Sequence, residues 1–291
     1  MTRMANFGDL PEEYSVLNRS EVVILPVPYD ATSTWIKGAD NGPAAIIEAS
    51  AHMELYDIET DSQAYRKGIY TAEHLDVGSS PDDMVEAVRQ QVEHYIENGK
   101  FVVVIGGEHS VSIGSVMAHA GRYNDITVLQ LDAHSDLRDE YEGSKYNHAC
   151  VMARVQEDCP IVQVGIRSMD YSEKAALDKN RVFFAESVLR DKDWKTKILS
   201  GLSEKVYITI DLDVFDPSIM PSTGTPEPGG LLWYDVLVLL KAVFDDKEVV
   251  GFDVVELCPD ERNKAPDFLA AKLIYKLLSY KFKDSDEIKH S

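Results

Sequence analysis

The chain has 291 residues, of which 44% are hydrophobic and 27% are charged, and this composition is typical of a globular protein with a large core. Its 50 Asp and Glu against 29 Lys and Arg give a formal net charge of −21, which disfavours nucleic acid as a partner because the phosphate backbone is also anionic. No apolar run approaches the roughly 20 residues of a membrane-spanning helix, and the first residues contain no signal-peptide core, so we expect a cytoplasmic protein that binds no membrane.

Short apolar or β-branched runs recur along the chain and predict strands that are buried on both faces. In chain order they are Val22–Leu25, Phe101–Ile105, Ile126–Leu131, Ile161–Val164, Val206–Ile210 and Val249–Val255, with Gly68–His74 and Arg181–Phe184 as two weaker candidates. Helical periodicity is found at Pro81–Asn98, Trp233–Phe244 and Pro266–Tyr280. This alternation predicts an α/β fold, in which helices flank both faces of a mainly parallel sheet of eight strands.

One domain is the simplest organisation, because the chain contains no linker-like composition and no fixed-period repeat. We expect residues 1–20 to form an N-terminal extension and residues 283–291 a frayed tail. The longest irregular stretch is Asp211–Gly230, and long loops in compact domains tend to be functional. The three cysteines, Cys150, Cys159 and Cys258, form no Cys-x-x-Cys pair, so we expect free thiols.

Metal-capable side chains follow four of the predicted strands, at the point where each strand ends. They are His109 after Phe101–Ile105, the run Asp132, His134 and Asp136 after Ile126–Leu131, the pair Asp211 and Asp213 after Val206–Ile210, and Glu256 after Val249–Val255. The ligand site of an open α/β sheet lies outside the carboxyl ends of its strands, so these separate segments are expected to converge there.

The spacing and the residue types indicate metal ions. At a strand end, residues two apart project to the same side, and carboxylates crowded in this way repel one another or take up protons unless cations hold them together. Two imidazoles with four carboxylates suit Mn²⁺ better than thiolate-seeking ions, and the histidines argue against Mg²⁺ and Ca²⁺. Each segment alone has a simpler interpretation as a polar turn or a helix cap, but independent turns would not share this chemistry. We therefore expect two divalent ions per chain.

The sequence resembles the ureohydrolase family, which includes arginase and agmatinase, in three motifs that occur in the family's order. They are Gly106-Gly107-Glu108-His109-Ser110, Asp132-Ala133-His134-Ser135-Asp136, and Asp211-Leu212-Asp213-Val214-Phe215-Asp216-Pro217, which continues to Gly224-Thr225-Pro226-Glu227-Pro228-Gly229-Gly230. Further matches extend the resemblance from about Val22 to Leu278. It implies a three-layer α/β/α domain around an eight-stranded parallel sheet, two Mn²⁺ ions per chain, a homo-oligomer (trimer or hexamer), and hydrolysis of a small cationic guanidino substrate to urea and an amine.

The resemblance also implies a role for each site residue. The predicted metal ligands are His109, Asp132, His134, Asp136, Asp211 and Asp213. By the same resemblance His148 handles protons and Glu256 faces the guanidinium. From the chemistry of the reaction, we also expect Asp136 to steady a nitrogen of the tetrahedral intermediate. Ala149 and Cys150 depart from the usual residues of the family after His148. A cysteine nucleophile at Cys150 with His148 as its base is disfavoured, because it leaves the carboxylate cluster unexplained.

The loop Leu137–Asn147 gives the only hint about the remainder of the substrate. It reads Arg138, Asp139, Glu140, Tyr141, Glu142, and three carboxylates against one Arg suit a distal ammonium group. We therefore expect Glu140 and Glu142 to bind substrate, and agmatine to be hydrolysed to urea and putrescine in polyamine biosynthesis. The alternatives are N1-aminopropylagmatine, guanidinobutyrate or arginine as substrate, and a non-catalytic metal-binding relative. The loop could also be a solvated acidic surface.

Overall fold

The computed structural model describes residues 6–78 and 80–283, and its centre is an eight-stranded sheet in which all neighbouring strands are parallel. The order across the sheet is β2-β1-β3-β8-β7-β4-β5-β6. The strand bounds are β1 Val22–Val27, β2 Ile69–Thr71, β3 Phe101–Gly106, β4 Ile126–Leu131, β5 Ile161–Ile166, β6 Val182–Phe184, β7 Lys205–Asp211 and β8 Glu248–Val255. The predicted fold class and strand number are therefore confirmed.

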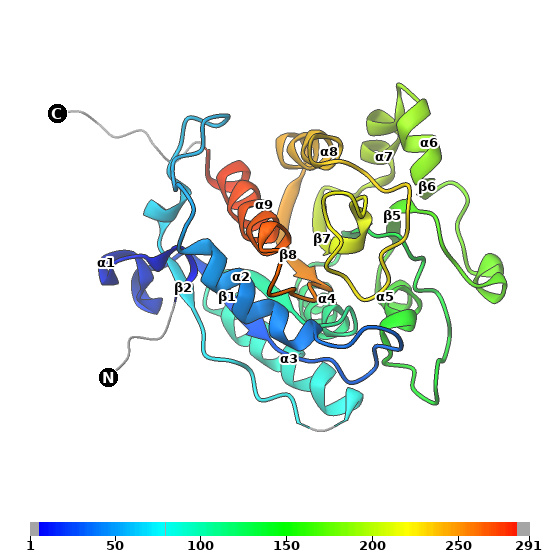
Figure 1. Cartoon of the computed structure of the whole chain (residues 1–291), viewed down its shortest axis with the longest axis horizontal. Helices are drawn as coiled ribbons and strands as arrows, with labels where there is room; N and C mark the ends of the chain where they lie inside the picture. The colour runs from blue at the N-terminus through cyan, green and yellow to red at the C-terminus, as the bar shows by residue number, and fades with distance from the viewer. Residues whose placement is uncertain (1–5, 79, 284–291) are drawn as a thin grey trace.

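Helices cover both faces of the sheet, with α8 and α9 on one side of the strands and α3 on the other (Figure 1). The α-helices are α1 Glu12–Ser15, α2 Gly42–Ser50, α3 Pro81–Glu97, α4 Val111–Arg122, α5 Val151–Asp158, α6 Ala185–Arg190, α7 Trp194–Gly201, α8 Trp233–Asp246 and α9 Ala265–Phe282. The three predicted helices thus differ from the observed α3, α8 and α9 by at most two residues at either end. Within the described part of the chain, no helix has both the length and the apolar character needed to cross a membrane.

Alternate residues of each strand face different cores, which explains why the strands are apolar without interruption. In β1, Val22 and Ile24 pack with α2, α8 and α9, whereas Val23 and Leu25 pack with α3, α4 and α5. A strand buried on both faces cannot alternate with polar residues. The sequence pattern of apolar runs therefore follows directly from the three-layer arrangement.

The N-terminal segment packs more closely than an extension would. Phe7 and Leu10 are almost completely buried and belong to the same core cluster as α2 and α9. At the other end of the chain, Lys283 lies 2.5 Å from a carboxylate oxygen of Asp245. The first five residues of the predicted extension and residues 284–291 of the predicted tail lie outside the described residues.

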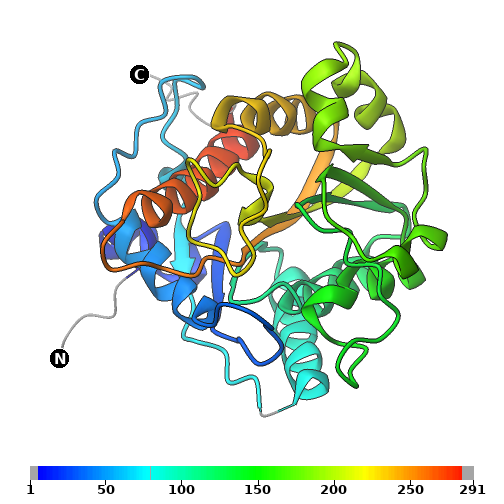
Figure 2. The same cartoon turned by 45° about the vertical axis from the view of Figure 1, so that its right-hand side comes forward.

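The strand order brings four strand ends together in the middle of the sheet. β8, drawn in orange in Figure 2, lies between β3 and β7, and β4 lies on the far side of β7. Because all four strands run in the same direction, the residues that follow them emerge at one edge. These residues are the acidic and histidine side chains identified in the sequence.

Candidate metal centre

His109 lies in the turn between β3 and α4, where two glycines allow the chain to bend sharply. A Cβ atom at Gly107 would lie 2.0 Å from the carbonyl oxygen of Tyr29, so only glycine fits that position. The imidazole of His109 is buried, and its Nε2 lies 2.9 Å from the hydroxyl oxygen of Thr209. The other ring nitrogen, Nδ1, is therefore directed to the opposite side of the ring.

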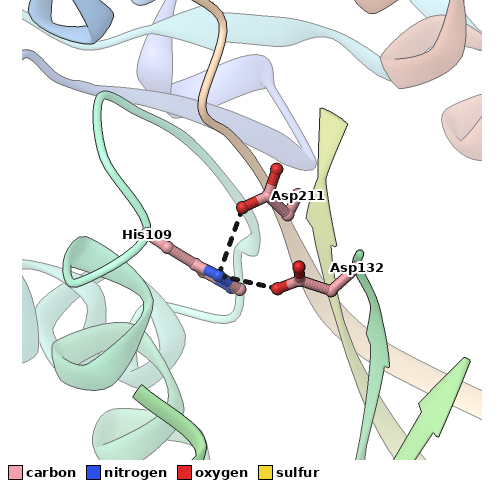
Figure 3. Close-up of side chains that lie close together, drawn as sticks. All are labelled: His109, Asp132 and Asp211. Carbon is pink, nitrogen blue, oxygen red and sulfur yellow. Dashed lines mark ion pairs between the residues drawn. The ribbon is translucent and has the colours of Figure 1, made fainter. Parts of the chain in front are cut away.

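Three carboxylates surround Nδ1 of His109. This atom lies 3.1 Å from Oδ2 of Asp132, 2.9 Å from Oδ2 of Asp136 and 3.5 Å from Oδ2 of Asp211. In Figure 3, Asp132 and Asp211 approach the imidazole from neighbouring strands. His109, Asp132 and Asp211 form a group whose ligand atoms all lie within 4.8 Å of one another, which is close enough to share one ion.

A second group with the same property contains Asp132, His134 and Asp213. Nδ1 of His134 lies 2.9 Å from Oδ2 of Asp213 and 3.7 Å from Oδ1 of Asp132. Asp132 thus presents Oδ2 to one histidine and Oδ1 to the other. A carboxylate shared in this way is the arrangement expected between two metal ions.

Backbone amides orient these carboxylates. The amide of Asp213 donates to Asp211 at 2.8 Å, and the amide of Ala133 donates to Asp213 at 2.9 Å. The amide of His134 donates to Asp132 at 2.5 Å. Each of these hydrogen bonds fixes one carboxylate oxygen, and a metal site requires such fixed ligands.

The four aspartates and two histidines of this cluster carry an excess of negative charge, which a pair of cations would balance. In the described structure the four aspartates form ion pairs only with the two imidazoles, and no Lys or Arg reaches them. Nδ1 of His109 is buried without a hydrogen-bond partner, although carboxylate oxygens surround it. A neutral imidazole would place a lone pair among anionic oxygens, which is unfavourable unless a cation, either a proton or a metal ion, lies between them.

The electrostatics agree with this interpretation. Burial, with the charges of Asp213 and Asp132, raises the pKa of Asp211 well above its ordinary value. Burial and the charge of Asp132 raise the pKa of Asp136 to about 7. Carboxylates in this environment take up protons when no cation is bound, so metal binding is expected to release protons.

Two residues of the site adopt the left-handed backbone conformation, which is uncommon for residues other than glycine. The φ angle is 51° at Asp136 and 67° at Glu256. Such a conformation costs of order 1–3 kcal/mol and persists where the surrounding structure enforces it. Both are site residues that the sequence predicts, and the surrounding structure holds each in this conformation.

His148 and Glu256 line the same cavity as the metal-ligand groups, and this cavity has a volume of about 320 Å³. His148 begins a short 3-10 helix (η5, His148–Cys150) that the side chain of Asn147 caps through the amide of Ala149, at 3.0 Å. Burial lowers the pKa of His148 to about 4, and charge on His109 acts in the same direction. The Glu256 carboxylate accepts the amide of His109 at 2.7 Å through Oε1.

Glu140 and Glu142 are both exposed, and neither lines the cavity, so a substrate-binding role for them stays a prediction. Tyr141 and Ser144 pair through two backbone hydrogen bonds of 3.0 Å, and the turn between them passes through positive φ at Glu142 (49°) and Gly143 (82°). This turn directs Tyr141 to the cavity and both glutamates to solvent.

Other residues of the cavity wall were not predicted. Arg138 lines the wall with its guanidinium 4.2 Å above the ring of Tyr141. Trp35, Met169 and Asp170 also contribute to the wall, from the loops after β1 and β5. Trp35, Met169 and Asp170 belong to no chemical pattern in the sequence, and only the strand order of the sheet brings their loops to the same cavity.

Cys150 is buried, and burial raises the pKa of its thiol to about 11. A thiol of this kind is a poor nucleophile. Cys150 and His148 also lie in a helical turn, so the extended backbone needed to align them on one side is not present. Ala149 lines the cavity directly.

Comparisons with known proteins agree with this geometry. The sequence profile of the arginase family matches residues 20–279. An N(1)-aminopropylagmatine ureohydrolase of Synechocystis sp. is 43% identical over 89% of this chain and 88% of its own length, and an agmatinase of Pyrococcus horikoshii is 31% identical over 88% and 90%. The crystal structure of an agmatine ureohydrolase of Thermoplasma volcanium superposes with a TM-score of 0.86 at 30% identity, covering 98% of this chain and 97% of that one.

Proposed function

The chain belongs to the arginase family, whose hydrolases act on guanidino groups, and we propose that it uses two Mn²⁺ ions to release urea from an amine-bearing guanidino substrate. The observation that carries this proposal is the position of Asp132 in both metal-ligand groups. Its two oxygens face different histidines, as a bridge between two ions requires. The mixed set of imidazole and carboxylate ligands suits Mn²⁺.

The guanidinium carbon is a poor electrophile because its positive charge is delocalised. When bound, the two ions would supply the Lewis acidity that generates a hydroxide nucleophile near neutral pH. The chain contributes orientation through Glu256, whose Oε1 accepts the His109 amide and whose other oxygen remains for the substrate guanidinium. A carboxylate and a guanidinium form strong charge-assisted hydrogen bonds in this arrangement.

Proton transfer is assigned to His148. Because its pKa is lowered, the imidazole is neutral at pH 7 and can accept a proton inside the cavity. The same group can then protonate the leaving amine, which must depart as a neutral molecule. Asp136, at the wall of the same cavity, can accept a hydrogen bond from a nitrogen of the substrate.

For the substrate, we place N1-aminopropylagmatine ahead of agmatine. A relative that is 43% identical carries the first activity in its name, and one that is 31% identical carries the second. At the cavity wall, Asp170 and the exposed indole of Trp35 are groups that attract an ammonium ion. Arg138 is also present there and would attract a carboxylate, so anionic substrates belong in the test.

The test is urea release by Mn²⁺-loaded protein from N1-aminopropylagmatine, agmatine, guanidinobutyrate and arginine at equal concentrations. We expect the highest kcat/KM for N1-aminopropylagmatine, followed by agmatine. A preference for arginine or guanidinobutyrate would overturn the assignment of a cationic tail. No urea from any of the four, in protein that contains two ions per chain, would favour a metal-binding relative without catalytic activity.

A further inference from the structure

Thr32 occupies a position between a buried carboxylate and the proton-handling histidine. Its hydroxyl oxygen lies 2.6 Å from Oε2 of Glu108 and 3.2 Å from Nδ1 of His148. The backbone amide of His148 also donates to this hydroxyl at 3.0 Å. Glu108 precedes the metal ligand His109 in the chain, and it is completely buried. The three residues therefore form a continuous hydrogen-bonded relay that ends at the cavity.

The direction of each hydrogen bond in this relay follows from counting donors. Oε2 of Glu108 accepts the backbone amide of Thr32 at 2.8 Å, which identifies this oxygen as an acceptor. The other oxygen, Oε1, accepts the hydroxyl of Ser110. The Thr32 hydroxyl has one proton, and at 2.6 Å it donates that proton to Oε2. Only its lone pairs then remain for His148.

The imidazole of His148 must donate a proton to one of the lone pairs of the Thr32 hydroxyl oxygen. Nδ1 faces an oxygen that can only accept, so Nδ1 carries the ring proton when the imidazole is neutral. Nε2, on the opposite side of the ring, is then the nitrogen with a free lone pair. Because His148 lines the cavity, this nitrogen is the one left to exchange protons there.

We propose that Thr32 and Glu108 are positioning residues that hold His148 in its Nδ1–H tautomer and so leave Nε2 as the proton carrier. This inference rests on the proposed function of His148. Neither residue contacts the reacting atoms, and both act through the ring of His148.

The environment of Glu108 supports a role beyond packing. Burying a carboxylate is costly, and among the described residues no Lys or Arg forms an ion pair with Glu108. All of its partners are hydroxyl and amide donors, from Thr32 and Ser110. Asp30 fixes the loop of Thr32 by accepting the Gly38 amide at 2.6 Å. The loop and the Glu108 carboxylate thus both fix the position of Thr32. A fixed hydroxyl is needed if it is to select one tautomer of His148.

The first experiment compares Thr32→Val, Thr32→Ser and Thr127→Val with the wild type, all loaded with Mn²⁺. Thr32→Val removes the hydroxyl, and we expect kcat to fall by roughly 10- to 100-fold while KM and the two ions per chain remain within about twofold. Thr32→Ser retains the hydroxyl and is expected to recover kcat to within about threefold. Thr127→Val is the matched control, since its buried hydroxyl pairs with Ser203 at the other end of β4.

Unchanged kcat in Thr32→Val would overturn the proposal, as would an equal loss in Thr32→Ser. Loss of metal in Thr32→Val alone would also overturn it, because the hydroxyl would then support the ions and not the tautomer. A similar fall in Thr127→Val would show that any buried hydroxyl has this effect.

The second experiment does not depend on activity. Long-range ¹⁵N–¹H spectra of protein loaded with diamagnetic Zn²⁺ identify which nitrogen of His148 is protonated, and His148→Ala assigns the signal. We expect the Nδ1–H form in the wild type and loss of this preference in Thr32→Val. An Nε2–H form in the wild type would refute the relay. If the wild type releases no urea from any guanidino compound, the proposed function fails, while this measurement still tests the relay.

Discussion

Two acidic clusters of the described structure, one around the buried Asp57 and one at the strand ends, are neutralised in different ways. In the first, Nζ of Lys276 on α9 lies 2.9 Å from both oxygens of Asp57 and 2.6 Å from Glu59. In the second, at the strand ends, four aspartates have only imidazoles as ion-pair partners within the described residues. The first cluster carries its own cation and is complete. The second is complete only when cations bind from solution.

The pKa of the buried carboxyl group is shifted in opposite directions in the two clusters. At Asp57, burial raises the pKa, but the hydrogen bonds from Lys276 and Thr60 and the charge of Lys276 together outweigh burial, so the pKa lies below its ordinary value. At Asp211, burial and the neighbouring aspartates act together and the pKa rises. Burial alone therefore does not distinguish a structural acid from a functional one. What differs between these two clusters is whether the chain supplies the neutralising cation.

The largest expected effect comes from removing the carboxylate that both metal groups share. Asp132→Ala should abolish urea release and leave fewer than two ions per chain, because the remaining ligands lose their common member. Elemental analysis after desalting and a urea assay measure both quantities. Asp57→Asn is the control from the other acidic cluster, and its metal content should match the wild type. Two retained ions in Asp132→Ala would contradict the bridging role.

The second prediction separates the role of His148 in proton transfer from a role in metal binding. His148→Ala should lower kcat by roughly 10²–10⁴-fold, the range for a lost general acid or base, with both ions retained. Steady-state kinetics and metal analysis on the same preparation provide the measurement. If the variant loses an ion, His148 belongs to the metal cluster and its assignment is incorrect.

The third prediction concerns the cation that the chain supplies. Lys276→Met should lower the free energy of unfolding by about 3–5 kcal/mol, because Asp57 is left buried without its partner. Denaturant titration measures this loss, and the metal content should not change. Lys272→Met is the matched control on the same helix, since its ammonium donates to the carbonyl oxygen of Glu54 at 3.0 Å and lies over the ring of Tyr275, and it forms no ion pair within the described residues. An equal loss in both variants would mean that the ion pair adds nothing.

The fourth prediction is the pH dependence of the difference in free energy of unfolding between the wild type and Lys276→Met. In the wild type the lowered pKa of Asp57 stabilises the fold above about pH 3.8, and this contribution is lost as the pH falls through the folded-state value. In Lys276→Met, burial still raises the pKa of Asp57 while the lowering effects of Lys276 are lost and only the hydrogen bonds from Thr60 oppose burial, so we expect acid to neutralise the carboxyl group and reduce the penalty. The gap between the two proteins should therefore narrow as the pH falls from 7 to 4. A gap that widens would contradict the assigned signs.

The smallest effect is expected at the acidic loop. Glu140→Gln and Glu142→Gln should leave KM for a cationic substrate within about twofold, because neither side chain lines the cavity. Asp170→Asn, which does alter the cavity wall, should raise KM more than either. Substrate titrations of the three variants decide the matter. A large rise in KM for Glu140→Gln or Glu142→Gln would support the sequence-based prediction.

The central strands could be predicted because each is an uninterrupted apolar run, and the three long helices because their apolar residues repeat with the period of a helix. Helix α4 could not, because small and polar residues are buried along it, including Gly114, Ser115 and His119. A Cβ at Gly114 would lie 2.4 Å from the carbonyl oxygen of Val85, so the close approach of α3 determines this composition. Such a tertiary requirement produces no local hydrophobic pattern.

The site likewise contains residues that the sequence predicts and residues that depend on tertiary structure. The two histidines and four aspartates occur in short motifs at strand ends, and the structure brings them together. The orientation of Glu142 depends instead on two successive residues with positive φ, Glu142 and Gly143, which composition does not reveal. Trp35 and Asp170 meet only because of the strand order, and sequence proximity gives no indication of that order.

The central position of β8 has a consequence for biosynthesis. This strand is the last of the sheet to leave the ribosome, yet it lies between β3 and β7, which are made earlier. Until residue 255 emerges, these two strands present open edges that invite intermolecular pairing. A ribosome stalled before β8 would therefore hold a nascent chain prone to aggregation and without Glu256. Chaperone demand should peak late in translation, when about 250 residues have been made.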